Sequence, residues 1–288
     1  MFKAVIAPIK GAFFGFLIFL NLFPIPLLIL MIGSLNLMIP KKRWRHAVDS
    51  FIHKRLVPAW VDVNSFILHL AAPKLEIVVK GEGNLSEQGW YCIIANHQSW
   101  IDILMLQRIF NHQIPVLKFF MKQSLLWKLP VIGLTCWLLN FPFMKRYSKS
   151  YLKKHPEKKG TDLEETRKSC ERFKEQPIAV ANFIEGTRFS KEKKQRQSSP
   201  YQNLLYPRAG GLSLALYALQ DCLQEIIDVT IVYPLGEPNF WDLLCGKMKK
   251  IVVYYKALPI PPTERKEFQK WLNNLWQQKD QLITSTHD

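Results

Sequence analysis

The strongest hydrophobic pattern in the chain lies within its first forty residues. Residues 11–40 (GAFFGFLIFLNLFPIPLLILMIGSLNLMIP) contain no charged residue. This run exceeds the roughly 20 apolar residues that a membrane-spanning helix needs. Pro24 and Pro26 interrupt it, because each removes a helical hydrogen bond and disfavours helix in the residue before it. The pattern predicts two half-helices, forming a single span or a re-entrant hairpin; a buried hairpin of a soluble protein is the remaining alternative.

Charges flank this apolar run on both sides. Lys3 and Lys10 precede it, and a denser basic cluster, residues 41–45 (KKRWR), follows it. Membrane proteins keep such clusters on the cytoplasmic side. A cleaved signal peptide has a shorter apolar core and a cleavage site of small residues. We therefore expect the segment to be retained, with the rest of the chain in the cytoplasm.

The region after the basic cluster mixes apolar and polar positions. In residues 46–72 they recur at helical spacing, with Pro58 near the middle. This predicts an interrupted amphipathic helix that can lie on a membrane surface. The pattern changes from Pro73 onward. We therefore divide the chain into a membrane anchor with an interfacial helix, residues 1–72, and a second domain, residues 73–288.

In the second domain, short apolar runs alternate with helical patterns. Strands are expected at residues 75–81, 90–96, 114–120, 177–184, 226–233 and 250–258, and helices near residues 100–110, 162–175, 210–220 and the C-terminus. β-Branched strands separated by crossover helices are typical of a parallel sheet. The predicted fold class is therefore α/β, with a mostly parallel central sheet flanked by helices and preceded by the hydrophobic anchoring segment.

Charge and cysteine content narrow the classes of partner. The chain has 39 Lys and Arg against 23 Asp and Glu, a formal net charge of +16. This favours nucleic acid, anionic lipid or phosphorylated metabolites. Two basic stretches, residues 145–162 and 188–200, are expected to be solvated surface or, beside a membrane, a docking surface for anionic lipid. The five cysteines are widely spaced without a CxxC pair, which argues against a disulfide framework or zinc site and favours a reducing compartment.

The segment ANHQSWID, residues 95–102, follows one of the predicted strands. In open α/β sheets, ligands bind beyond the carboxyl ends of the strands. His97 can act there as a general base if Asp102 holds its other ring nitrogen. Ser99 and Asp102 also match a capping box, in which Ser99 begins the helix and Asp102 stabilises its first turn. Spacing does not decide between these roles, and the two are compatible.

A second segment, EGTR (residues 185–188), follows another predicted strand. Gly186 can adopt the positive φ of a tight turn, and Arg188 can bind a phosphate through two hydrogen bonds, helped by backbone N–H groups. Taken alone, the segment is better explained as an ordinary strand-end turn with a surface arginine. Lys122 and Arg146, taken singly, are unremarkable basic residues.

Taken together, the order and spacing of these segments resemble the glycerolipid acyltransferase family, the lysophosphatidic acid acyltransferases. The matching blocks are NHQSWID (96–102), FPFMKR (141–146), FIEGTRF (183–189) and IVYP (231–234). Longer stretches resemble the YihG-type branch of bacterial inner-membrane members. Residues 73–288 would then be the catalytic domain.

The resemblance implies transfer of a fatty acyl group from acyl-CoA or acyl carrier protein to a lysophospholipid hydroxyl, most simply 1-acylglycerol-3-phosphate to give phosphatidic acid. It implies that His97 is the base, Asp102 its orienting partner and Lys122 the group that stabilises the oxyanion. It assigns phosphate binding to Arg146, Glu185, Gly186, Thr187 and Arg188. We expect no cofactor, metal or covalent acyl-enzyme, because the base activates the alcohol directly and the thioester is already reactive.

The resemblance also implies the partners: a thioester donor, a lysophospholipid acceptor and an anionic membrane surface, with no nucleic acid, at the cytoplasmic face of the inner membrane. Ile184, Phe189 and Tyr233 differ from residues common in the family blocks, which leaves the acceptor open. Lysocardiolipin and lysophosphatidylglycerol are alternative acceptors. A membrane-tethered basic binding protein without enzymatic activity is the alternative from a different class.

Overall fold

A six-stranded sheet forms the centre of the protein. The computed structural model describes residues 2–144, 155, 176–262 and 264–287. The strand order is β1 (Glu76–Glu82), β8 (Lys250–Leu258), β7 (Glu225–Val232), β2 (Trp90–Ala95), β6 (Ile178–Phe183) and β3 (Leu117–Phe119). Four of the five strand pairings are parallel, and β7 and β8 pair antiparallel. The predicted mostly parallel α/β sheet is confirmed.

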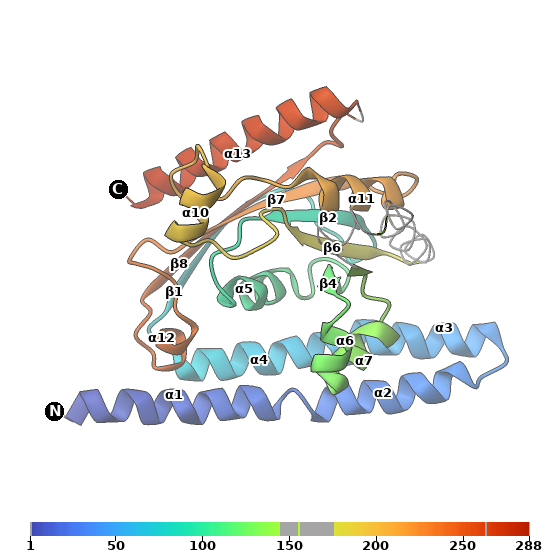
Figure 1. The fold of residues 1–288 in the computed structure, drawn as a ribbon. Coiled ribbons are helices and arrows are strands. Elements are labelled where there is room, and N and C mark those ends of the chain that lie inside the picture. Colours follow the sequence, from blue (N-terminus) through green and yellow to red (C-terminus); the bar gives the residue numbers. More distant parts are fainter. Residues whose placement is uncertain (1, 145–154, 156–175, 263, 288) are drawn as a thin grey trace.

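Helices cover both faces of this sheet (Figure 1). Helices α11 (Ala209–Leu219) and α13 (Arg265–His287) pack on one face, and α5 (Ile101–Phe110) packs on the other. The apolar side chains of α5 recur at helical spacing, so Met105, Leu106 and Ile109 are all buried against the sheet. Since α5 directly follows β2, its first turn lies at the carboxyl end of that strand.

The amphipathic segment forms one nearly continuous helical rod below α5 in Figure 1. Helix α3 (Lys42–Phe51) leads through a π-helical turn, η1 (Ile52–Leu56), into α4 (Val57–Ala71). The interruption predicted near Pro58 is this π turn, in which the N–H of Val57 donates to the carbonyl of Ile52. Pro58 has no N–H to offer the preceding turn, and a π turn accommodates that loss without ending the helix.

Two apolar helices form the base of the molecule. Helix α1 (Phe2–Leu20) and helix α2 (Pro24–Leu37) follow one another along the rod in Figure 1, and Pro24 begins the second helix as the sequence predicts. The stretch Ile6–Leu37 is long and apolar enough to cross a membrane. At the break between the helices, the Asn21 amide donates to Asn64 Oδ1 over 3.0 Å and the Asn21 carbonyl accepts from Trp60 over 2.9 Å. Polar groups exposed by the break are therefore bonded to α4.

Residues on both sides of position 72 share one apolar core. Phe14 and Ile18 of α1 pack against the same cluster that contains Leu68 of α4 and Ile93 of β2. The division of the chain at residue 72 stays a prediction.

Several short elements complete the described chain: α6 (Leu125–Lys128), α7 (Pro130–Leu138), α10 (Lys191–Gln197), α12 (Phe240–Leu244) and the paired strands β4 (Met121–Lys122) and β5 (Phe143–Met144). The basic stretch 188–200, expected to be a loop or solvated surface, contains α10. The Ser190 hydroxyl caps this helix by accepting from the N–H of Lys193 over 3.3 Å. The helix expected at 162–175 and the basic stretch 145–162, apart from residue 155, lie outside the described residues.

Candidate active site

His97 and Asp102 form a hydrogen-bonded pair where β2 turns into α5. His97 Nδ1 lies 2.8 Å from Asp102 Oδ2. An ionised carboxylate only accepts, so Nδ1 carries the proton and Nε2 keeps a lone pair. The His97 side chain is 13% exposed, whereas that of Asp102 is fully buried. The predicted spatial pairing is therefore confirmed, and the free nitrogen belongs to a partly accessible ring.

The Asp102 carboxylate accepts hydrogen bonds from four donors. Besides the imidazole, Oδ2 accepts the N–H of Gln98 over 2.6 Å and that of Ser99 over 2.8 Å. The Tyr233 hydroxyl donates to Oδ1 over 2.5 Å. Burial raises the pKa of Tyr233 well above its usual value, so the hydroxyl keeps the proton that it donates. These four bonds fix the position of the buried carboxylate beside the imidazole.

The predicted capping box is present just before α5. Helix α5 begins at Ile101, and Trp100 directly before it already has a helical conformation. Ser99 Oγ accepts the N–H of Ile101 at 3.4 Å, and Asp102 Oδ2 accepts the N–H of Ser99 at 2.8 Å, which is the reciprocal bond of a capping box. The Asp102 carboxylate accepts hydrogen bonds from the N–H groups of Gln98 and Ser99 and so stabilises a turn in the chain. Asp102 therefore both fixes the start of the helix and holds His97.

Glu185 joins the His97 loop to the segment that precedes α11. Its fully buried carboxylate accepts the N–H of His97 through Oε1 over 2.7 Å and the N–H of Leu205 through Oε2 over 2.8 Å. Burial raises the pKa of Glu185 to about 8, although these two N–H donors act to lower it. A buried carboxylate that faces backbone N–H groups offers nothing to a phosphate. The geometry gives Glu185 a positioning role in place of the phosphate contact that the resemblance implies.

The EGTR turn holds both the main chain and the ring of His97. Gly186 has a φ of 69°, as expected for its place in the turn, and its N–H donates to the carbonyl of Phe183 over 2.8 Å. The reversed chain brings the N–H of Phe189 to the carbonyl of His97 at 2.7 Å. The Phe183 ring stacks on the imidazole with centroids 4.0 Å apart. Two segments far apart in sequence thus form a single site.

Two cationic side chains flank this turn. The exposed Arg188 guanidinium lies 4.8 Å from the centroid of the Trp100 ring, three residues from His97. The Lys193 ammonium donates to Thr187 Oγ1 over 3.0 Å and to the carbonyl of Arg188 over 2.8 Å. Two cations at a turn beside a histidine base suit a substrate that carries both a hydroxyl and a phosphate.

The side-chain positions of two predicted site residues are not described. Lys122 lies in β4, where its backbone pairs with Met144 of β5, and its side-chain position is not described. Arg146 lies outside the described residues. The roles of both stay predictions. Within the described ranges, no group of three or more His, Cys, Asp or Glu could hold a metal ion.

Sequence reasoning missed three residues that contact this site: Tyr233, Phe183 and Lys193. In the sequence, Tyr233 stands out only because it differs from the residue common before the proline of the family's fourth block (IVYP). Nothing in its local pattern indicates a bond to Asp102. Lys193 was hidden within a basic stretch that is typical of solvated surface. Phe183 is a strand-end aromatic, a position usually occupied for packing alone.

A family model described as Acyltransferase matches residues 76–234. The chain belongs to the acyltransferase family. The matched region runs from β1 to just beyond β7 and includes the His97 loop and the EGTR turn, so the predicted family resemblance is confirmed.

Individual relatives of this acyltransferase share about a quarter of its residues. It is 28% identical over 207 residues to the probable 1-acyl-sn-glycerol-3-phosphate acyltransferase 5 of Arabidopsis thaliana, covering 66% of this chain and 52% of that protein. It is 25% identical over 294 residues to lysocardiolipin acyltransferase 1 of Gallus gallus, covering 97% of this chain and 71% of that one. The chain thus spans about half the length of the plant relative.

A solved structure shares the fold of this acyltransferase. The crystal structure of PlsC, the 1-acyl-sn-glycerophosphate (LPA) acyltransferase of Thermotoga maritima, superimposes with a TM-score of 0.61 over 98% of each chain, at 15% sequence identity. The likeness extends over the N-terminal helices as well as the sheet. The narrower assignment to the YihG-type branch stays a prediction.

Proposed function

We propose that this acyltransferase moves a fatty acyl group from a thioester donor, acyl-CoA or acyl carrier protein, to the free hydroxyl of a lysophospholipid. The observation that carries the proposal is the His97 imidazole, held through Nδ1 by a buried carboxylate with Nε2 left to accept a proton. The names of the plant and chicken relatives support a lysophospholipid as the acceptor.

The reaction follows from the state of the imidazole. His97 Nε2 takes the proton of the acceptor hydroxyl while the oxygen attacks the thioester carbonyl carbon, forming the new C–O bond. Asp102 stabilises the resulting imidazolium. The tetrahedral intermediate collapses by breaking the C–S bond, and the leaving thiolate takes the proton from His97. A positioned general base of this kind typically contributes about 10²–10⁴-fold in rate.

The remaining groups complete this scheme. We assign the oxyanion of the intermediate to Lys122 on the basis of the family resemblance. An oxyanion donor is typically worth roughly 10²–10³-fold in kcat. Arg188 binds the acceptor phosphate with Lys193 beside it, the Gly186 turn and Thr187 support them, and Arg146 serves the same polar region. The scheme needs no metal ion or cofactor, since the histidine activates the alcohol and the thioester is already reactive.

For the acceptor, we propose 1-acylglycerol-3-phosphate, which becomes phosphatidic acid. Its phosphate monoester matches the two cations that flank the EGTR turn. Lysocardiolipin is the second candidate, because the chicken relative that bears its name aligns with 97% of this chain.

We propose that the protein works at the cytoplasmic face of an inner membrane. Large apolar side chains of α1 and α2, including Phe13, Phe16 and Leu35, are more than half exposed. Apolar surface of this extent fits contact with lipid. The basic cluster at residues 41–45 lies at the start of α3, where an anionic leaflet would attract it.

The Arg188→Ala variant tests the phosphate assignment. A hydrogen-bonded charge contact is worth about 1.5–3 kcal/mol, so KM for 1-acylglycerol-3-phosphate should rise roughly 10- to 100-fold with kcat little changed. Use of monoacylglycerol, which has no phosphate, should not change. Steady-state assays with both acceptors measure this, with Arg196→Ala on the exposed face of α10 as the matched control. An equal loss with both acceptors would contradict phosphate binding by Arg188.

The Tyr233→Phe variant tests the support of Asp102. It removes the donor to Oδ1 and keeps the ring in place, and the lost bond to a charged group should lower kcat roughly tenfold without raising KM. Tyr254→Phe, which removes a hydroxyl bonded to Thr286 instead, is the control and should keep the wild-type kcat. Equal kcat values for the two variants would show that Tyr233 plays no part in orienting the pair.

A further inference from the structure

The amino end of α11 lies at the same edge of the sheet as His97. The N–H of Arg208, the residue before α11, donates over 2.8 Å to the carbonyl of Ile184, just beyond β6. Glu185 connects the two places, because its carboxylate accepts the N–H groups of both His97 and Leu205. Helix α11 packs on the face of the sheet opposite α5 (Figure 1). The helix end is therefore a neighbour of the His97 loop, on the other face of the sheet.

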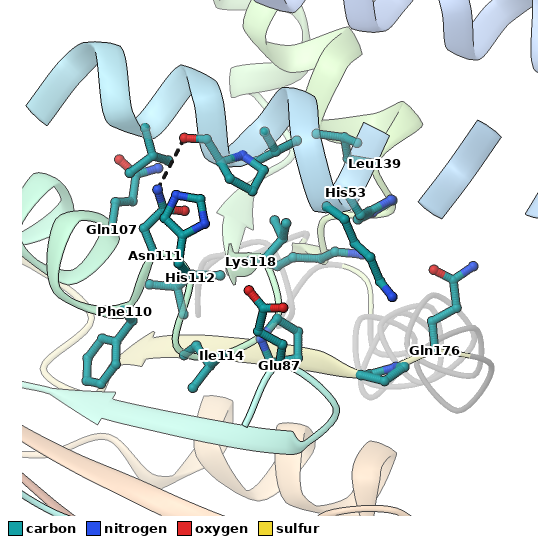
Figure 2. A pocket seen from close by; sticks show the side chains of 18 of the residues that line it. His53, Glu87, Gln107, Phe110, Asn111, His112, Ile114, Lys118, Leu139 and Gln176 are labelled. Carbon is teal, nitrogen blue, oxygen red and sulfur yellow. Dashed lines mark hydrogen bonds between the residues drawn. The ribbon is translucent and has the colours of Figure 1, made fainter. Parts of the chain in front are cut away.

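The pocket drawn in Figure 2 is at the opposite edge of the sheet. Its wall includes Glu87, which precedes β2, and Gln176, which precedes β6. Both strands run in parallel from this pocket toward His97 and α11. The amino end of α11 is therefore a separate place in the fold.

Helix α11 begins without a side chain that can accept its first N–H groups. Helices usually begin at Ser, Thr, Asp or Asn, whose side-chain oxygen accepts one of these groups. Arg208 occupies this place in an extended conformation, and an arginine side chain can only donate. The first N–H groups of a helix have no partner within it, and the aligned peptide dipoles add positive potential there. This end of α11 therefore favours an anion.

Two glycines in the first turn of α11 leave room beside these N–H groups. Among the described residues, a Cβ atom at Gly210 would meet no neighbouring segment within 4 Å. A Cβ atom at Gly211 would lie 2.9 Å from Nδ2 of Asn182 on β6. Neither glycine has a positive φ, and glycine is unfavourable inside a helix, so the backbone conformation does not account for them. The close approach of the Asn182 amide accounts for Gly211.

Asn182 adds a buried donor to this helix end. Its side chain is 8% exposed, and its Nδ2 has no hydrogen-bond partner among the residues that the structure describes. A buried amide without a partner is costly, so such groups are rare in folded proteins. Nδ2 points into the notch that Gly211 leaves in the first turn of α11. The Asn182 amide, the first N–H groups of α11 and the exposed Arg208 guanidinium are all donors, and this set fits a phosphate, whose oxygens accept.

We propose that the amino end of α11 binds a phosphate group of the acyl donor. This inference rests on the proposed function, because it takes a thioester as the donor. Acyl-CoA and acyl carrier protein both carry the acyl group on a phosphopantetheine arm, whose length separates its phosphate from the thioester. The acceptor phosphate is assigned to Arg188, which lies against the Trp100 ring. A second anion site at this edge of the sheet holds the donor phosphate while the thioester reaches His97.

Calorimetric titration of the full-length protein with phosphopantetheine tests the site without any catalysis, and pantetheine is the probe that lacks the phosphate. Arg208→Met should weaken phosphopantetheine binding about ten- to hundredfold and leave pantetheine binding unchanged. Asn182→Leu should weaken phosphopantetheine binding about tenfold without lowering the melting temperature, because it removes a buried amide that has no partner. Arg196→Met, exposed on α10, is the matched control and should bind as the wild type does.

The Gly210→Glu variant separates phosphate binding from helix stability. A carboxylate in the first turn of α11 complements the helix dipole, so the melting temperature should stay the same or rise. The same carboxylate takes the place of the anion, so phosphopantetheine affinity should fall about a hundredfold or more. Ser213→Glu places the same charge at an exposed position about one turn further along α11 and should bind as the wild type does.

Acyl-transfer kinetics show which substrate owns the phosphate. Arg208→Met should raise KM for acyl-CoA by about the factor seen in binding, with no such rise for 1-acylglycerol-3-phosphate or for an S-acyl-N-acetylcysteamine, a donor without phosphate. A raised KM for the acceptor in place of the donor would overturn the inference. So would wild-type phosphopantetheine affinity in Arg208→Met and Gly210→Glu. Binding that depends on Arg208 in a protein that transfers no acyl group would contradict the proposed function and leave the anion site supported.

Discussion

Replacement of His97 by alanine is expected to lower kcat for acyl transfer by about 10²–10⁴-fold. Alanine leaves no group to take the proton of the acceptor hydroxyl. It leaves the EGTR turn in place, because Glu185 and Phe189 bond the main chain of residue 97. KM for the acceptor should therefore change little. Steady-state kinetics on purified protein, with melting temperatures for each variant, measure both.

His112→Ala is the matched control for this change. His112 is an exposed histidine whose Nε2 lies 3.0 Å from Asp62 Oδ2. Like His97 it is paired with an aspartate, but it lies outside the site. This variant should keep the wild-type rate. Full activity of His97→Ala would contradict the mechanism outright.

Replacement of Asp102 by asparagine is expected to lower kcat by roughly 10²- to 10⁴-fold while the fold persists. The N–H groups of Gln98 and Ser99 require an oxygen at the Oδ2 position, so the new amide nitrogen must face Tyr233. The tyrosine hydroxyl can accept there in place of donating. The asparagine oxygen still accepts the proton of His97 Nδ1. The change therefore removes the charge that stabilises the imidazolium and reverses only the hydrogen bond with Tyr233.

A comparison with Asp102→Ala separates catalysis from folding. Alanine breaks all four hydrogen bonds of the carboxylate and leaves buried donors without partners, so it should lower both kcat and the melting temperature. Thermal unfolding and kinetics on the two variants give the comparison. A wild-type kcat in Asp102→Asn would mean that the carboxylate only fixes the start of α5.

The strands and the central pair were accessible from the sequence because their signals are local. Apolar runs rich in β-branched residues predicted strands close to the observed bounds, as for β8 at Lys250–Leu258. The His97–Asp102 contact was accessible because a short turn from strand to helix can bring the residue five positions further on back toward His97. The family blocks then connected this turn with EGTR, which no spacing argument could do across almost ninety residues.

The rest of the site depends on contacts between distant segments. Glu185 resembles a surface charge in the sequence, but the fold buries it against the N–H groups of His97 and Leu205. Ser99 and Asp102 form the predicted capping box, but the further bonds of the Asp102 carboxylate to Gln98 and Tyr233 depend on the fold and have no signal in the spacing. Pro58 predicted an interruption, and only the packed rod shows that a π turn absorbs it.

A mass-spectrometric assay of the purified wild-type protein with mixed lysophospholipids and acyl-CoAs tests the proposed acyl transfer most directly. We expect acyl-CoA to be consumed as an equal amount of a diacyl phospholipid appears, with 1-acylglycerol-3-phosphate converted to phosphatidic acid in preference to the other acceptors. Thioester hydrolysis without any acylated lipid, or no consumption of either substrate, would contradict it.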